Sequence, residues 1–212
     1  MITFYQRTDC PFCWKVRLAL VELRLDYEVV DTQLGEKHPD VLRLSPTGTV
    51  PVLVDGDVAI WESRVMLDYL DQRYAQGALL PPGPDLQAGV RLIHAYSDKC
   101  IGPALRELVF EKRSKPCDEW DQELISRSEE AWRACQAYLE TKLDQQWLNS
   151  GTLSAAECAL AARCGVAEAY GADVDVQYTA LHSWFQAVKL RPSWAFAYPE
   201  SFPGIGRGQT TI

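Results

Sequence analysis

The stretch that decides the fold of this chain runs from the apolar segment MITFY at residues 1–5 to the motif CPFC at residues 10–13. The apolar segment predicts a β-strand, and apolar side chains at helical spacing over residues 14–23 predict a helix directly after the motif. Pro11 suits the first position of that helix, where a backbone N–H would have no helical partner in any case. We therefore place Cys10 at the start of the helix.

A cysteine at a helix start is predicted to be reactive. Its sulfur faces unpaired N–H groups and the positive end of the helix dipole, which favours the thiolate over the thiol. Lys15 and Arg17 add positive charge nearby in the sequence. Cys10 is therefore the candidate nucleophile, and Cys13 either resolves an intermediate as a second thiol or tunes the first.

Two other interpretations of the motif are a buried structural pair of cysteines and half of a zinc site. A structural zinc site of this kind needs a second pair of ligands. The remaining cysteines are not spaced as C-x-x-C, and they stand at positions 100, 117, 135, 158 and 164. A redox motif is favoured over both alternatives, and no metal is expected.

The composition bounds the class of protein. The chain has 212 residues, of which 47% are apolar, and seven are tryptophans, so a folded core is expected. A formal net charge of -8 repels phosphate backbones and argues against direct nucleic-acid binding. Seven cysteines without framework-like spacing fit a reducing compartment. With no membrane-length apolar run and no signal-peptide pattern, we expect a soluble, cytoplasmic protein.

Three further strands are predicted in the first half of the chain. Residues 27–30 form a strand that lies parallel to the first, because a helix connects the two. The dipeptide Asp55-Gly56 separates apolar runs at residues 50–54 and 58–61, which is typical of a β-hairpin.

A second helix start follows the hairpin. Ser63 has two interpretations. It caps this helix and has no other role, or the N–H groups at the helix start also bind the carboxylate of a ligand. The order of strands and helices brings Cys10, Val50, Glu62 and Ser63 to one end of a small sheet.

Pro51 begins a strand, where the missing N–H is tolerated. A cis Val50-Pro51 bond would leave the N–H and C=O of Val50 free to pair with an extended peptide, whereas a trans bond would make Pro51 an ordinary strand start.

Three motifs give this half a family resemblance. CPFC at residues 10–13, SPTGTVPVL at residues 45–53 and Glu62-Ser63 resemble the thioredoxin-like domain of the glutathione transferase superfamily. WESR at residues 61–64 is similar to the stringent starvation protein A branch, and the cysteine motif resembles the omega class and the glutaredoxins. The resemblance implies a homodimer that uses glutathione as co-substrate.

The resemblance also implies roles for single residues. Cys10 matches the omega-class nucleophile. The remaining matches surround glutathione: Lys37 near its glycyl carboxylate, Val50 and a cis Pro51 beside its cysteinyl part, and Glu62 and Ser63 at its γ-glutamyl end.

Three more residues are expected near the thiolate. Tyr5 is a rival nucleophile, because several classes use a tyrosine at the end of the first strand. A phenol titrates near pH ~10 when unperturbed, so we place Tyr5 in packing behind Cys10. Phe12 lies inside the motif. The beta class brings in a histidine and a lysine from the second domain; here Asp98-Lys99 is the best match, without the histidine.

The expected architecture is an α/β thioredoxin-like domain at residues 1–75, a linker at 76–84 and an all-helical domain at 85–212. The sequence of the helical half shows a capping box of Ser154 and Glu157. Residues 200–212 are expected to form a loose tail. The predicted helices cover residues 86–112, interrupted at Gly102-Pro103, then 118–143, 154–169 and 181–189.

The leading functional prediction is a glutathione-dependent transferase or thiol-disulfide reductase, in which the Cys10 thiolate forms a mixed disulfide with glutathione. Conjugation of small electrophiles is a neighbouring activity, with an acceptor pocket formed by residues 94–110 and 194–198. The alternative is a non-enzymatic regulator that docks on RNA polymerase, as the stringent starvation branch does.

Overall fold

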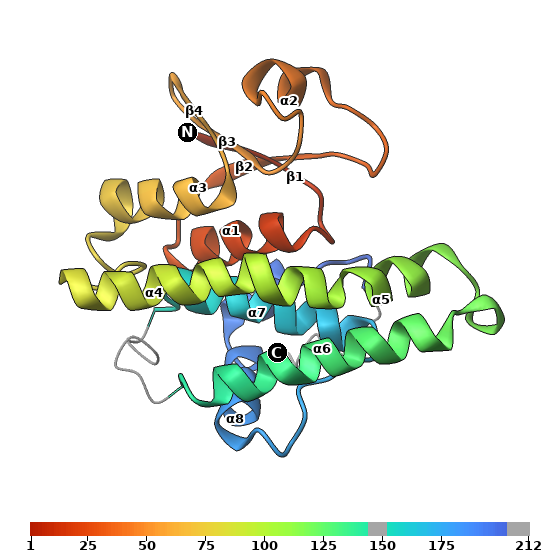
Figure 1. Ribbon diagram of the computed structural model, residues 1–212. Coiled ribbons are helices and arrows are strands. Elements are labelled where there is room, and N and C mark those ends of the chain that lie inside the picture. The colour runs from red at the N-terminus through yellow and green to blue at the C-terminus, as the bar shows by residue number, and fades with distance from the viewer. Residues whose placement is uncertain (144–151, 203–212) are drawn as a thin grey trace.

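A computed structural model describes residues 1–143 and 152–202 of the chain (Figure 1). Its sheet has four strands in the order β2-β1-β3-β4. β1 runs parallel to β2 and antiparallel to β3, and β3 pairs antiparallel with β4, so the predicted parallel pair and hairpin are confirmed. The strands are β1 (Ile2–Gln6), β2 (Tyr27–Asp31), β3 (Val52–Asp55) and β4 (Val58–Trp61).

Helices cover both faces of the sheet. α1 (Pro11–Glu22) and α3 (Ser63–Leu70) lie between the sheet and the helical half, whereas α2 (Pro39–Leu44) lies on the opposite face (Figure 1). α1 is buried on nearly every side, because the sheet covers one face and α7 covers the other. The first helix therefore forms the layer that joins the two halves of the molecule, with Cys10 at its N-terminal end.

The helical half is built around α7 (Ala155–Ala169), whose residues from Ala155 to Ala167 are buried. The predicted capping box is confirmed: Ser154 Oγ accepts a hydrogen bond from the Glu157 N–H, and the Glu157 side chain accepts one from the Ser154 N–H. The other elements of this half, with the short segment that precedes it, are η1 (Asp71–Ala75), α4 (Pro84–Tyr96), η2 (Ser97–Ile101), α5 (Gly102–Ser114), η3 (Cys117–Glu119), α6 (Gln122–Glu140), α8 (Thr179–Lys189) and α9 (Pro192–Ala197).

The predicted interruption at Gly102-Pro103 is wrong. The chain passes from α4 through the π-helical turn η2 directly into α5, and the three segments form one long rod (Figure 1). Pro103 lies directly after the π turn, in which the Gly102 N–H donates to the Ser97 carbonyl. The π turn inserts an extra residue into the rod, a feature that often accompanies functional sites.

Aromatic packing joins α1 to the helical half. The Trp14 and Trp194 rings lie 4.8 Å apart, and both side chains are fully buried. Gly165 lies against the same rings, so closely that a Cβ atom there would be 2.3 Å from Trp14 and 2.6 Å from Trp194. Glu22 at the end of α1 accepts two hydrogen bonds from Arg191, at 2.8 and 2.6 Å.

The start of the predicted loose tail is packed instead. Phe202 is 7% exposed, and its ring lies 5.8 Å from Trp14 and 5.9 Å from Tyr170. The prediction is therefore wrong for this residue, because the aromatic cluster on α1 offers it an apolar surface. The rest of the tail, residues 203–212, lies outside the described residues.

Within residues 1–143 and 152–202, no helix is both long enough and apolar enough to span a bilayer. The same residues contain no group of three or more His, Cys, Asp or Glu side chains placed to hold a metal ion.

Candidate active site

Cys10 is the residue that precedes the first turn of α1, as predicted, and Pro11 occupies the first turn. The Cys10 carbonyl accepts hydrogen bonds from the N–H groups of Cys13 and Trp14, at 3.0 and 2.8 Å, which fixes the helix start. The Cys10 side chain is 8% exposed and lines two neighbouring cavities. Its sulfur is therefore both anchored and reachable.

The environment of Cys10 favours its thiolate. A hydrogen bond from the Cys13 thiol lowers the pKa of Cys10 to about 6, against the opposing effect of burial. The backbone N–H groups of Cys13 and Phe12 and the charge of Arg7 act in the same direction. Cys13 is wholly buried, and burial raises the pKa of its thiol. The two sulfurs thus have different states near neutral pH: Cys10 a thiolate, and Cys13 a protonated donor.

Arg7 is a cation near Cys10 that was not predicted from the sequence, while the charges of Lys15 and Arg17 also interact with Cys10 as predicted. Its backbone N–H donates to the Cys13 sulfur at 3.4 Å, and its side chain is held by Asp9 at 2.5 Å. Arg17 instead donates to the Ala197 carbonyl at 2.9 and 2.7 Å and serves to anchor the C-terminal segment. The only sequence signal for Arg7 was its place between the first strand and the motif.

Lys15 belongs to a buried polar cluster between α1 and the long rod. Its Nζ donates to both oxygens of Asp98, at 2.9 and 2.7 Å, and lies 2.8 Å from His94 Nε2. Burial lowers the pKa of Lys15 to about 8, opposed by the charge of Asp98. Lys99, which was expected beside the thiolate, is exposed, and Asp98 is the member of that pair that faces the site.

Phe12 forms the ridge between the cavities around Cys10. It is 37% exposed, and its ring lies 5.1 Å from Lys15 Nζ and 4.7 Å from Arg163 Cζ. Both of these cations hold the Phe12 ring in place through cation–π attraction. Phe12 therefore lines every one of the three cavities described below, as its place in the motif suggested.

The strand-edge cavity extends from Cys10 along the chain before β3, with a volume of about 430 Å³, and Lys37 and Val50 line it. Lys37 Nζ donates to the Gly48 carbonyl at 2.9 Å. The Val50-Pro51 bond is cis. Among the described residues, the Val50 N–H and C=O take part in no backbone hydrogen bond, so this strand edge is open to an extended peptide.

The helix-start cavity lies on the other side of Val50, with a volume of about 170 Å³. Glu62 and Ser63 line it together with Pro51. Glu62, with φ of 75°, occupies the cap position of α3, and Ser63 is the first helical residue. The predicted cap at Ser63 is therefore wrong by one residue: its buried hydroxyl lies inside the first turn, beside the N–H groups of the helix start.

Tyr5 does not line these cavities. It is 9% exposed, its hydroxyl donates to Asp40 at 3.5 Å, and its ring packs against His38 with centroids 5.5 Å apart. Burial, followed by the charge of Asp40, raises the pKa of the phenol. A packed phenol that is harder to ionise than usual is a poor nucleophile, which leaves Cys10 as the candidate.

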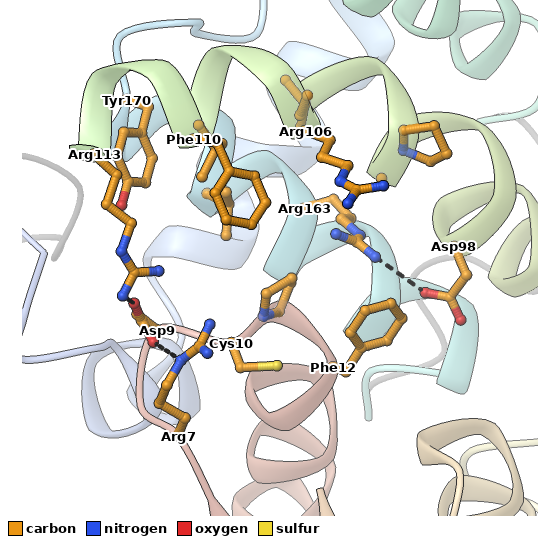
Figure 2. Close-up of a pocket in the computed structure, with 16 residues that line it drawn as sticks. Arg7, Asp9, Cys10, Phe12, Asp98, Arg106, Phe110, Arg113, Arg163 and Tyr170 are labelled. Carbon is orange, nitrogen blue, oxygen red and sulfur yellow. Dashed lines mark hydrogen bonds and ion pairs between the residues drawn. The ribbon is translucent and has the colours of Figure 1, made fainter. Parts of the chain in front are cut away.

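A third cavity, the α5–α7 cavity, opens on the far side of Cys10 between α5, α7 and the start of α1, with a volume of about 420 Å³ (Figure 2). Of the predicted residues 94–110, those from Asp98 to Phe110 contribute to its wall. Residues 194–198 do not, because Trp194 and Tyr198 are buried against Trp14. Arg163, Val166 and Tyr170 take their place.

Comparison with known proteins shows which family the chain resembles. Residues 4–78 match the model described as "Glutathione S-transferase, N-terminal domain". The solved structure of a glutathione S-transferase from Rhodospirillum rubrum F11 superposes with a TM-score of 0.85 at 28% identity, covering 98% of each chain. The chain is therefore similar to the glutathione S-transferase superfamily, by the family model over residues 4–78 and by the fold over its whole length. Its fold is the thioredoxin-like sheet with a C-terminal helical domain that the sequence predicted.

Other proteins that are similar to this chain carry different names. A structure from Methylobacillus flagellatus KT titled with glutathione bound has a TM-score of 0.77 at 26% identity, covering 94% of this chain and 100% of that one. "FtsZ-localized protein A" of Caulobacter vibrioides is 28% identical over 92% of this chain and 90% of its own length. A stringent starvation protein A homolog of Pasteurella multocida is 38% identical, but over only 44% of this chain and 43% of its own length.

Proposed function

We propose that this protein is a glutathione-dependent thiol-disulfide reductase whose nucleophile is Cys10. The observation that carries the proposal is a reachable cysteine with a lowered pKa that lies where a peptide-binding strand edge meets an apolar cavity. A thiolate attacks a disulfide sulfur far faster than a thiol does. Glutathione fits the first of these surfaces, because it is an extended, anionic tripeptide with one free amine.

In the proposed complex, glutathione crosses the two cavities on either side of Val50. The free N–H and C=O of Val50 pair with its cysteinyl part, and Lys37 faces its glycyl carboxylate. At the other end, the N–H groups at the start of α3 and the Ser63 hydroxyl bind the γ-glutamyl carboxylate, and Glu62 binds the amine. This arrangement brings the glutathione sulfur toward Cys10.

The proposed reaction has two exchanges. The Cys10 thiolate attacks the glutathione sulfur of a mixed disulfide, the old S–S bond breaks, and the other thiol leaves as its thiolate. A second glutathione thiolate then attacks the glutathione sulfur bound to Cys10, giving glutathione disulfide and restoring the Cys10 thiolate. Cys13 acts as the hydrogen-bond donor that lowers the pKa of Cys10, since its buried thiol has a raised pKa.

The test is turnover of the mixed disulfide between glutathione and mercaptoethanol, coupled to glutathione reductase. Wild-type protein is expected to turn it over, and Cys10→Ser is expected to lose the activity. Cys117→Ser is the matched control, because Cys117 is exposed and lies outside these cavities. A Cys10→Ser variant as active as wild type would refute the proposal.

A non-catalytic, partner-binding role is the second candidate, because a relative matched over 92% of this chain is named for its localisation with FtsZ. Wild-type protein that neither turns over the disulfide nor binds immobilised glutathione would favour it. The regulator on RNA polymerase, the homodimer and the cytoplasmic location expected from the sequence stay predictions.

A further inference from the structure

The α5–α7 cavity is electropositive although the chain is acidic. Four arginines and two aspartates contribute to its wall together with the Cys10 thiolate, so it carries a surplus of one positive charge in a chain with a net charge of -8. Figure 2 shows the arginine side chains on both sides of the space beside Cys10. The described arginines of the wall are Arg7, Arg106, Arg113 and Arg163.

The aspartates already have cationic partners. Asp9 lies between Arg7 at 2.5 Å and Arg113 at 2.7 Å. Asp98 accepts from Lys15 at 2.7 Å and lies 3.6 Å from an Arg163 nitrogen. The carboxylates therefore bind several cations at once, and the cavity keeps positive charge that they do not neutralise.

Arg106 is the arginine whose charge is left over. Within residues 1–143 and 152–202 it forms no ion pair, and its guanidinium lies 5.8 Å from the centre of the Phe110 ring. It extends from α5 toward the space beside Cys10 (Figure 2). A planar guanidinium of this kind is suited to bind a carboxylate with two hydrogen bonds.

Apart from these charges, the wall of the cavity is largely apolar and aromatic. Phe110 is 52% exposed, so a flat apolar group has a ring to stack on. The volume of about 420 Å³ is within the range of small-molecule sites. Other apolar members of the wall are Pro103, Leu105, Val109 and Val166.

We propose that the α5–α7 cavity selects, as second substrate, glutathione mixed disulfides of aromatic thiols that carry a carboxylate, and that Arg106 binds this carboxylate. The inference rests on the proposed function. The aromatic ring lies against Phe110 while the disulfide faces Cys10. The Cys10 thiolate attacks the glutathione sulfur, the S–S bond breaks, and the aromatic thiol leaves as its thiolate with its carboxylate unchanged.

The experiment compares two chromogenic substrates: the glutathione mixed disulfides of thionitrobenzoate and of nitrothiophenol. Both release a nitroaryl thiolate, and only the first carries the carboxylate. Arg106→Gln should raise KM for the thionitrobenzoate compound about fivefold, as expected for one partly exposed ion pair, and leave KM for the nitrothiophenol compound unchanged. Arg127→Gln, at an exposed arginine of α6, is the matched control and should change neither value.

The outcomes separate the two proposals. If wild-type protein turns over both substrates and Arg106→Gln changes neither KM, the inference is wrong and the proposed function stands. If neither aromatic substrate is turned over while the glutathione–mercaptoethanol disulfide is, the inference is wrong and the proposed function stands. If none of the three disulfides is turned over, the proposed function fails, and binding to Cys10→Ser protein decides the inference. Anilinonaphthalene sulfonate should then bind more tightly than the uncharged phenylnaphthylamine, and Arg106→Gln should abolish the difference; equal affinity would overturn the inference.

Discussion

Replacing Cys13 by alanine removes the hydrogen bond that stabilises the Cys10 thiolate. A hydrogen bond to a charged group contributes about 1.5–3 kcal/mol, and one pKa unit corresponds to about 1.4 kcal/mol, so the pKa of Cys10 should rise to between about 7 and 8. Starting from a pKa of about 6, the thiolate fraction at pH 7 should fall from about nine tenths to between one half and one tenth.

The measurement is the rate of alkylation of Cys10 by iodoacetamide as a function of pH. The exposed Cys100 and Cys117 also react, so the Cys10 peptide is followed by mass spectrometry. The midpoint of the profile is the readout, because a thiolate of higher pKa is intrinsically more nucleophilic and partly offsets its lower population. Arg7→Gln should raise the midpoint less, because the charge of Arg7 lowers the pKa of Cys10 less than the hydrogen bond from Cys13 does.

Two results would refute this reasoning. A Cys13→Ala midpoint equal to that of wild type would show that the Cys13 thiol does not stabilise the thiolate. A wild-type midpoint near ~8.5, the value of an ordinary cysteine, would show that Cys10 is not activated at all.

Two further predictions concern the contacts that hold α1 against the helical half. Gly165→Ala places a Cβ 2.3 Å from Trp14. Because overpacking of this kind is destabilising, the free energy of unfolding in urea should fall by about 1–3 kcal/mol. An unchanged unfolding midpoint would contradict the packing described. Burial opposes ionisation of Asp98, but the hydrogen bond from His94 and the charge of Lys15 hold its pKa below the ordinary value. The stability that Asp98 contributes is therefore present above pH ~4 and lost as pH falls through the lower folded-state pKa. Asp98→Asn should make the melting temperature fall less steeply as the pH is lowered below ~4. An unchanged dependence of the melting temperature on pH would exclude this contribution.

The position of Cys10 could be predicted from the sequence because its causes are local. An apolar strand, a proline and a helical repeat follow one another within 23 residues, and each restricts the backbone next to the motif. The capping box of Ser154 and Glu157 was predictable for the same reason.

The charges around Cys10 could not all be assigned from the sequence, because they depend on contacts between distant residues. Lys15 bonds with Asp98, 83 residues further along the chain, and Arg17 bonds with the Ala197 carbonyl, 180 residues away. Proximity in the sequence suggested that both faced the thiolate. Burial gives both of them hydrogen-bond partners elsewhere, so they act on Cys10 only through their charge, and Arg7 joins them as a cation near the thiolate.

The wall of the α5–α7 cavity shows the same limit. Residues 94–110 were predicted to contribute, and those from Asp98 to Phe110 do. The aromatic residues 194–198 were also predicted there, but Trp14 covers Trp194 and Tyr198. The length and type of a segment can be inferred from its pattern; the partner that covers it depends on the tertiary fold.

The most direct test of the central claim is to identify the residue that carries glutathione during the reaction. Wild-type protein is incubated with a glutathione mixed disulfide, the second glutathione is withheld, and the adduct is located by peptide mass spectrometry. We expect one glutathione on Cys10, which added glutathione removes. An adduct confined to the exposed Cys100 or Cys117, or none on any cysteine, would contradict a mechanism in which the Cys10 thiolate attacks the disulfide.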